Sequence, residues 1–271
     1  MSSIISNGKM IPVREPIASV TDEGLRYGRG AFETIRVVHG APAHFDLHMA
    51  RLKEAISALH LPCNDPDSFC LSLYEESLSL IAANQLKDGS LRIQVFAANH
   101  STASAIPIYV IQTGNIDGPY DKNNLRLTSY RNSIKSADAI SHLKHCNYLP
   151  YILAMHHAQA QGFDDALVFN QFNRICESAR ANLFMISNGE IFTPPISEGC
   201  IAGIIRGLLM KHLLTQGWKL QERPIAEADL KNADEIFLTN SLRGIMQVAC
   251  LDDKELKNNL TAAISVSFGE I

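Results

Sequence analysis

The chain has 271 residues, of which 46% are hydrophobic and 19% are charged, and its formal net charge is −4. This length and composition can bury the core of one large domain or of two modest lobes. Lysine and arginine are scattered along the chain, so nothing favours binding to nucleic acid or to a membrane surface. The hydrophobic residues form no run of about 18, the length that a membrane-spanning helix needs.

The cysteines indicate a reducing compartment. None of the six forms a C-x-x-C pair, and the chain is not a short disulfide-rich scaffold, so the pattern is typical of free thiols. The segment from Met1 to Pro12 has no apolar run like that of a signal peptide. We therefore expect a cytoplasmic protein.

The first part of the chain predicts strands and two helices. Asn7-Gly8 lies between two short apolar runs and predicts a hairpin, because both turn positions need a positive φ. A β-rich run covers residues 32–38, and Asp46 is the expected N-cap of a helix. A second helix is expected between Pro66 and Ala83. Two further strands are expected over residues 91–97 and 106–113.

Residues 114–124 are rich in Gly, Pro, Asp and Asn, which indicates a boundary. Beyond it we expect a strand over 125–130, a polar loop through Ser141 and a helix that Gly162 ends. The remaining expected elements are strands over 165–170, 235–239 and 245–251, a hairpin around Asn188-Gly189 and a helix over 204–216 after Gly203. The mixture predicts an α+β protein with a smaller lobe over 1–114, a connection over 115–124 and a larger lobe over 125–271.

Lys144 is the first candidate for chemistry, because it lies between a polar loop and a long helix. A lysine in a partly apolar place has a lowered pKa, since its ammonium is poorly solvated there. Such lysines form Schiff bases with carbonyl compounds. Taken alone, the position is much more typical of a solvated surface lysine.

Three more segments carry candidates. Glu177 lies between a turn and a strand, where an acid can also be an ordinary turn residue. Gly203 precedes a helix directly, and free N–H groups at a helix start favour an anion, although many helices begin this way. The polar loop over residues 239–244 is ambiguous by itself.

Six segments match, in order, the pattern of one known family. They run from Asp22 to Arg36, from His48 to Leu52, around Lys144, around Glu177, from Gly203 to Arg206 and from Ala233 to Ser241. Together they resemble the class IV aminotransferases, also called fold type IV pyridoxal 5′-phosphate (PLP) enzymes, and they cover nearly the whole chain. The resemblance implies a two-lobed fold with PLP in the cleft between the lobes, a small-molecule amino substrate and a homodimer.

The resemblance also implies a role for each matched position. Lys144 would bind PLP covalently and later move the substrate's α-proton. Glu177 would pair with the pyridine nitrogen and keep it protonated, so that the ring can accept electrons. The expected phosphate contacts are Arg51, the backbone N–H groups of Ile204 and Ile205, and the hydroxyl of Ser241.

Four side chains have looser assignments. Tyr148 matches a tyrosine near the cofactor's ring hydroxyl in the branched-chain enzymes. Phe32, Arg180 and Arg243 are candidates for substrate contacts, because each lies in or beside a matched segment. A metal site is not favoured, because the histidines at 142, 145, 156 and 157 lack the compact ligand set that zinc prefers.

Two departures from the family pattern bear on the activity. Many members have threonine where this chain has Ile205, so one hydroxyl is missing from the phosphate site. Many D-amino acid aminotransferases carry an arginine after the strand that ends at Ala97, and the segment Phe96 to His100 has none. The second departure disfavours a D-amino acid substrate.

The segments around Lys144 and over residues 240–248 resemble the family's 4-amino-4-deoxychorismate lyases more than its branched-chain aminotransferases. We therefore expect a lyase that releases pyruvate and leaves 4-aminobenzoate. An aminotransferase for branched-chain or D-amino acids is the alternative, and a binding protein without catalysis is a remote third. Sibling activities in one family share motifs, so resemblance alone does not separate them.

Overall fold

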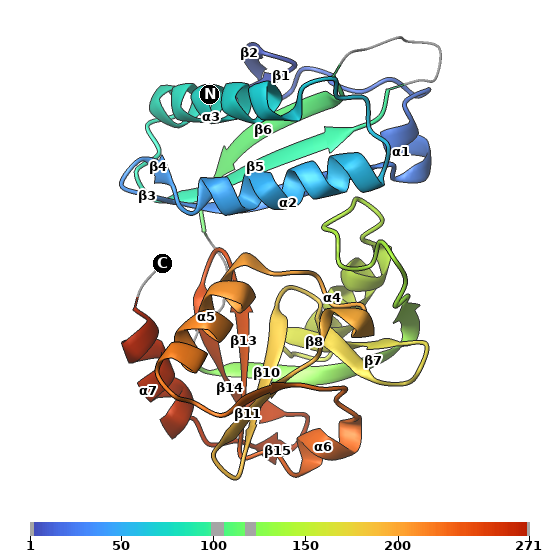
Figure 1. The fold of residues 1–271 in the computed structure, drawn as a ribbon. Coiled ribbons are helices and arrows are strands. Elements are labelled where there is room, and N and C mark those ends of the chain that lie inside the picture. Colours follow the sequence, from blue (N-terminus) through green and yellow to red (C-terminus); the bar gives the residue numbers. More distant parts are fainter. Residues whose placement is uncertain (1–2, 99–105, 117–122, 270–271) are drawn as a thin grey trace. The chain divides into compact units, whose positions relative to one another are not determined.

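The computed structural model describes residues 3–98, 106–116 and 123–269 (Figure 1). The chain divides into two compact units. The first comprises residues 1–117 and Leu143–Asn147, and the second comprises residues 118–142 and 148–271. The short segment that contains Lys144 therefore groups with the first unit, although the residues on both sides of it belong to the second. Most of the expected connection over residues 115–124 lies outside the described residues, and the predicted lobe boundaries stay a prediction.

The first unit is built on a six-stranded sheet with the spatial order β2-β1-β6-β5-β3-β4. Its strands are β1 (Ser3–Ser6), β2 (Lys9–Pro12), β3 (Gly30–Val38), β4 (Ala41–Pro42), β5 (Gly89–Phe96) and β6 (Ile108–Gly114). The predicted first hairpin is confirmed, because Ser6 pairs with Lys9 and the turn residues Asn7 and Gly8 have φ angles of 49° and 77°.

Helices α2 (Phe45–Ala58) and α3 (Pro66–Ala83) run along this sheet, and the short α1 (Glu23–Tyr27) precedes β3 (Figure 1). Apolar side chains of α2 and α3 form one core with alternate residues of the strands, among them Ile35 and Ile93. The prediction that Asp46 caps α2 is wrong. The helix begins at Phe45, after His44 in a left-handed conformation, and Asp46 lies in the first turn, where a negative charge suits the helix dipole.

The second unit contains a nine-stranded sheet, in which β15 pairs with β14 beside the path β12-β11-β10-β13-β14-β7-β8-β9. The strands are β7 (Leu125–Lys135), β8 (Asp165–Asn170), β9 (Ile175–Ser178), β10 (Asn182–Ser187), β11 (Glu190–Thr193), β12 (Leu220–Glu222), β13 (Glu235–Asn240), β14 (Gly244–Leu251) and β15 (Lys254–Glu255). Residues from distant strands of this path, such as Phe169 and Leu183, share one core, so the sheet curls around it.

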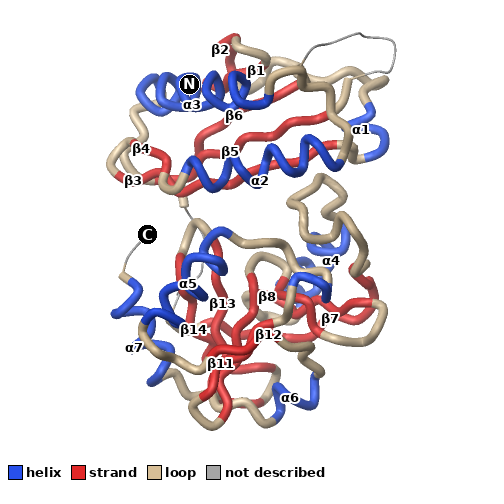
Figure 2. The backbone as a smooth tube through the Cα atoms, in the orientation of Figure 1, coloured by secondary structure: helices blue, strands red, loops and turns tan. Residues whose placement is uncertain are grey.

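Helices cover the outside of the curled sheet (Figure 2). They are α4 (Leu149–Ala160), the short 3-10 helix η1 (Ile196–Glu198), α5 (Ile204–Thr215), α6 (Glu227–Lys231) and α7 (Asn259–Phe268). Helices α5 and α7 pack on the stacked rings of Phe184 and Phe237, and α4 packs on Ala166 and Val168 of β8. None of the helices among the described residues combines the length and apolarity needed to cross a membrane.

One strand is longer than its sequence predicts. The polar run after Tyr130 predicts a loop, but β7 continues to Lys135 across an irregularity in its pairing with β8, between Tyr130 and Ile134. Helix α4 begins at Leu149, two residues after its expected start at about Asn147. The continuation of β7 places Lys135 beside Glu177.

Candidate active site

Lys144 is held by backbone pairing along the start of β3. Its carbonyl oxygen accepts a hydrogen bond of 3.0 Å from the N–H of Phe32, and Cys146 donates to the carbonyl of Gly30 at 2.8 Å. The side chain of Lys144 is half-buried, and its Nζ lies 4.6 Å from the centre of the Phe32 ring. The strand thus fixes the lysine's backbone, and an aromatic face, which attracts a cation, lies near its amine.

Arg51 is buried in a cluster with Glu33 and His48. Its Nε and Nη2 donate to the two carboxylate oxygens of Glu33 at 2.8 and 2.6 Å. Nδ1 of His48 must also donate to Glu33, at 2.6 Å, because a carboxylate only accepts. The charge of Lys144 also lowers the pKa of His48 slightly, so Lys144 lies within electrostatic range of this cluster.

Two pKa values in this cluster are lowered, for different reasons. Burial alone would raise the pKa of Glu33, but the Arg51 guanidinium and the hydrogen bonds from His48 and Arg51 outweigh it and lower the value to about 2. Burial lowers the pKa of His48, although its hydrogen bond to Glu33 opposes the shift. The cluster therefore favours an anionic Glu33 beside a neutral His48.

The opposite face of the same sheet carries an arginine that sequence reasoning missed. Phe32 and Thr34 alternate with the core residues of β3, and Thr34 pairs with Arg92 of β5. The Arg92 guanidinium carbon lies 4.0 Å from the centre of the Phe32 ring. Arg92 lies within β5 rather than after it. The two-residue periodicity of β3 and β5 is the sequence signal that places it on the same face as Phe32.

Glu177 is buried in β9 of the second unit and accepts four hydrogen bonds. Its Oε1 accepts from Nζ of Lys135 at 3.1 Å, from the hydroxyl of Tyr151 at 2.5 Å and from the N–H of Ile201 at 3.0 Å. Its Oε2 accepts from Nδ2 of Asn182 at 3.1 Å. The carboxylate is therefore fixed in orientation by donors from four separate segments.

Two of these donors, Lys135 and Tyr151, were missed from the sequence. Lys135 lies on the part of β7 that was expected to be loop. Tyr151 follows Tyr148 by one helical turn, and their rings stack with centres 4.3 Å apart. The structure thus links the predicted Tyr148 to the predicted Glu177 through Tyr151. The sequence signal for Tyr151 was its place three residues after Tyr148 on an expected helix, since a tyrosine that is buried there needs a partner for its hydroxyl.

The start of α5 has the character of an anion site. Gly203 is its N-cap and makes no side-chain capping bond, so the N–H groups of Ile204 and Ile205 open the helix without partners inside it. A Cβ on Gly203 would lie 1.9 Å from Oδ1 of Asn182, so only glycine fits here. Asn182 pairs with Thr239 across the sheet, and Oγ1 of Thr239 is enclosed with no hydrogen-bond partner among the described residues.

Two turns carry the remaining predicted residues. The side chain of Asn240 accepts from the N–H of Arg243 at 2.9 Å and donates to the carbonyl of Arg180 at 3.4 Å. It therefore ties the turn that holds Ser241, which is half-buried, to the turn that holds Arg180.

Asp165 binds the turn that holds Arg180 through hydrogen bonds to its carboxyl. Its carboxyl accepts from the hydroxyl of Ser178 at 2.8 Å and from the backbone N–H of Arg180. Burial raises the pKa of Asp165 to about 6, although these hydrogen bonds and the charge of Arg180 oppose the shift.

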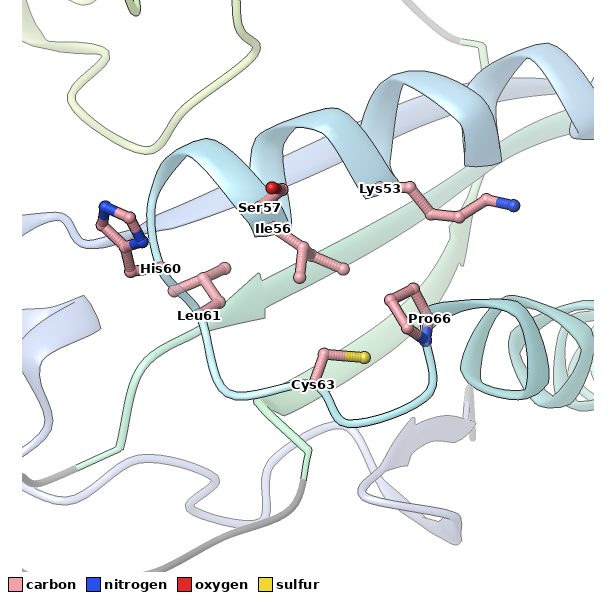
Figure 3. A pocket seen from close by; sticks show the side chains of 7 residues that line it. All are labelled: Lys53, Ile56, Ser57, His60, Leu61, Cys63 and Pro66. Atoms are coloured by element: carbon pink, nitrogen blue, oxygen red, sulfur yellow. The ribbon is translucent and has the colours of Figure 1, made fainter.

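A cavity of about 370 Å³ lies elsewhere, between the end of α2 and the start of α3 (Figure 3). Its walls include Lys53, His60 and Cys63, and none of the predicted site residues lines it. Lys53 is already paired with Asp67 at 2.6 Å, so the cavity offers no free cation of its own. Among the described residues, no group of three or more His, Cys, Asp or Glu side chains is placed to hold a metal ion.

The chain is similar to known proteins over almost its whole length. The chain is 25% identical to an aminodeoxychorismate lyase from Vibrio harveyi, over 87% of this chain and 88% of the relative. It is 27% identical to a D-alanine aminotransferase from Staphylococcus aureus, over 98% and 94%. The solved structure of the 4-amino-4-deoxychorismate lyase from Pseudomonas aeruginosa is 28% identical, covers 96% of each chain and superposes with a TM-score of 0.83.

The family model of the class IV aminotransferases matches residues 30–251, a span that includes Lys144, Glu177 and the start of α5. Because this match covers most of the chain, the chain belongs to the class IV aminotransferases, and it is a PLP-dependent lyase or aminotransferase.

Proposed function

We propose that this enzyme is a 4-amino-4-deoxychorismate lyase, which eliminates pyruvate and leaves 4-aminobenzoate. The observation that carries the proposal is the similarity to the Pseudomonas aeruginosa lyase, at 28% identity over 96% of both chains. The resemblance to lyases of the segments around Lys144 and over residues 240–248 supports the same choice.

The charges and donor groups of the proposed residues suit PLP. We propose that Nζ of Lys144 binds the cofactor covalently and that Glu177 pairs with its pyridine nitrogen. The helix start at Ile204 and Ile205 suits a phosphate, and the buried hydroxyl of Thr239 gives it a further donor. When bound, PLP supplies an electron sink for the bond that breaks at the substrate's α-carbon.

Arg51, Ser241 and Tyr148 keep their proposed roles at the phosphate and the ring hydroxyl. Arg51 pairs with Glu33 through Nε and Nη2, and a guanidinium is also a strong partner for a phosphate dianion. Phe32, Arg180 and Arg243 stay proposed substrate contacts, and Arg92 joins them because its guanidinium lies over Phe32.

The protein's own part in the reaction is proton transfer. We propose that Nζ of Lys144 takes the α-proton from the carbon that bears the substrate's amino group. The bond between the ring and the enolpyruvyl oxygen then breaks, and the ring becomes aromatic. The leaving group takes the bonding electrons as an enolate and gains one proton as it becomes pyruvate, which balances the proton that Lys144 removed.

Transamination is the second candidate, because the chain is also 27% identical to a D-alanine aminotransferase. The two activities differ in their need for an acceptor. Purified enzyme with PLP and aminodeoxychorismate should release pyruvate without any keto acid, as followed by coupled oxidation of NADH. Strict dependence on 2-oxoglutarate would favour transamination. A binding protein without catalysis would bind no PLP and would lack its near-visible absorption.

A homodimer in the cytoplasm completes the proposal. Leu149, Ile152 and Leu153 form a stripe on α4 at helical spacing, and 65%, 38% and 39% of their surfaces are exposed. A second copy of this chain would cover that stripe. The described cysteines are free, which suits a reducing compartment. Leu149→Asp should therefore lower the mass measured by light scattering from dimer toward monomer.

A further inference from the structure

The two carboxylate oxygens of Glu177 accept different numbers of hydrogen bonds. Oε1 accepts three hydrogen bonds, from Lys135, Tyr151 and Ile201, whereas Oε2 accepts one, from Asn182. A carboxylate oxygen has about two lone-pair directions, so Oε1 is saturated and Oε2 retains one. The open acceptor direction on this buried acid therefore belongs to Oε2.

Lys135 supplies a fixed positive charge beside Oε1. It is 6% exposed, and besides Glu177 it donates to the carbonyl oxygens of Ser141 and Gly199. These three bonds use all three protons of the ammonium group. Lys135 therefore cannot turn away from Glu177 without leaving a buried proton unpaired, which is costly.

Tyr151 supplies a neutral donor that stays protonated. It is buried, and its hydroxyl must donate to Glu177, because the carboxylate only accepts. Burial and the charge of Glu177 raise the pKa of Tyr151 well above its usual value. The phenol of Tyr148 stacks on Tyr151, and the thiols of Cys176 and Cys200 lie within electrostatic range of Glu177. Burial raises the pKa of both thiols, which keeps them neutral.

We infer that Tyr151 and Lys135 are positioning residues that turn Oε2 of Glu177 toward the pyridine N–H of PLP and keep that proton on the ring. The inference rests on the proposed role of Glu177. Donors to Oε1 stabilise the carboxylate and reduce its affinity for the ring's proton. The ring then stays positively charged, which strengthens it as an electron sink.

The test is a pH titration of the holoenzyme, followed by the near-visible absorption of its bound PLP. Tyr151→Phe keeps the ring stack and removes one donor, so the carboxylate holds the ring's proton more strongly. A less positive ring lets the nitrogen that joins PLP to Lys144 keep its own proton to higher pH. We therefore expect the midpoint of this titration, the pH at which half of that nitrogen has lost its proton, to rise by about one pH unit.

Matched variants separate this effect from packing. Tyr130→Phe alters a tyrosine of the same apolar cluster and should leave the midpoint where it is. Lys135→Met should raise the midpoint further, and Lys135→Arg should return it toward that of the parent, because the charge is restored. An unchanged midpoint in the Tyr151→Phe holoenzyme would overturn the inference.

The parent enzyme tells the two proposals apart. If it binds PLP and releases pyruvate while the Tyr151→Phe midpoint stays unchanged, the inference alone fails. If the parent shows no absorption of bound PLP, the proposed function fails together with the inference.

Discussion

Arg51 and Glu33 form a two-point ion pair inside the first unit, in which Nε and Nη2 of the arginine lie 2.8 and 2.6 Å from the two carboxylate oxygens. Both side chains are buried, at 8% and 1% exposure. Breaking a buried pair by removing one partner leaves an uncompensated charge, which typically costs about 3 kcal/mol or more. The free energy of unfolding at low pH therefore reports on the ion pair between Arg51 and Glu33.

The variant Glu33→Gln should lose that contribution. The pKa of Glu33 is lowered from 4.5 to about 2, so its stabilisation is present above pH 4.5 and is lost as the pH falls toward 2. We expect the parent to be more stable than Glu33→Gln by about 3 kcal/mol at pH 7 and the two to converge toward pH 2. Urea unfolding across this range measures the difference.

Asp67→Asn is the matched control for this prediction, because the ion pair between Asp67 and Lys53 is exposed and should contribute little. Equal stability of Glu33→Gln and the parent at pH 7 would show that the buried pair does not stabilise the fold.

Local signals in the sequence identified most of the elements. Asn7-Gly8 and Asn188-Gly189 turn where they were expected to, with positive φ at all four residues, because short turns depend on few neighbours. Pro66 and Ala83 are the ends of α3, as its helix signals predict. The end of β7 was missed because its residues after Tyr130 are mostly polar, and α7 was missed although its residues are largely apolar.

The candidate site was only partly predictable for a different reason. The resemblance to the family pointed to Lys144 and Glu177, whose roles at PLP stay predictions. It did not identify Tyr151, Lys135 or Thr239. Tyr151 meets Glu177 through the packing of α4, Lys135 meets it through the irregular end of β7, and Thr239 meets Asn182 through strand pairing. Tertiary contacts of this kind leave no fixed spacing in the sequence.

The second prediction tests the covalent attachment of PLP. Lys144→Ala should abolish activity, because no other amine would take over both the bond to PLP and the proton transfer. Borohydride treatment of the parent should fix the cofactor to the peptide that contains Lys144, as read by mass spectrometry. Lys219→Ala removes an exposed lysine and should keep full activity and labelling. Label on a different lysine would refute the assignment.

The third prediction concerns the acid at the ring. Glu177→Gln keeps the shape of the side chain but removes its charge, so PLP should still bind. Proton removal from the substrate's α-carbon should slow by at least about a hundredfold, because a prepositioned charge is lost. Exchange of α-deuterium with solvent measures this step directly. Glu198→Gln alters another buried acid of the same unit and should leave the exchange rate near that of the parent. Equal rates in both variants would argue against an electron-sink role for Glu177.

The fourth prediction uses the raised pKa of Asp165. Its value of about 6 lies above the 3.8 of a free aspartate, so folding opposes its ionisation. Below pH 4 the carboxyl is neutral in the folded and the unfolded protein, so it does not reduce stability. As the pH rises from about 4 to 6, the free energy of unfolding falls by up to about 3 kcal/mol, because the unfolded chain ionises first. Asp165→Asn should remove that loss and flatten stability between pH 4 and pH 7. The neighbouring, half-buried Asp164 gives the control variant Asp164→Asn, which should keep the slope of the parent.

The last prediction concerns the start of α5, where Gly203 lies against Asn182. A Cβ at position 203 would meet Oδ1 of Asn182 at 1.9 Å and push that side chain away from Glu177 and Ile201. Gly203→Ala should therefore weaken PLP binding by at least about tenfold, the equivalent of one or two lost hydrogen bonds. Titration of the apoenzyme with PLP, followed by absorption, gives the dissociation constant.

Gly207 offers a control on the same helix. A Cβ there meets nothing within 4 Å, so Gly207→Ala should leave PLP affinity unchanged and stabilise the helix by about 0.5–1 kcal/mol. If both alanine variants bind PLP as tightly as the parent, the helix start at Gly203 does not hold the phosphate. If both lose affinity equally, the loss reflects a general response of α5 rather than the contact with Asn182. Only a loss confined to Gly203→Ala supports the proposed phosphate site.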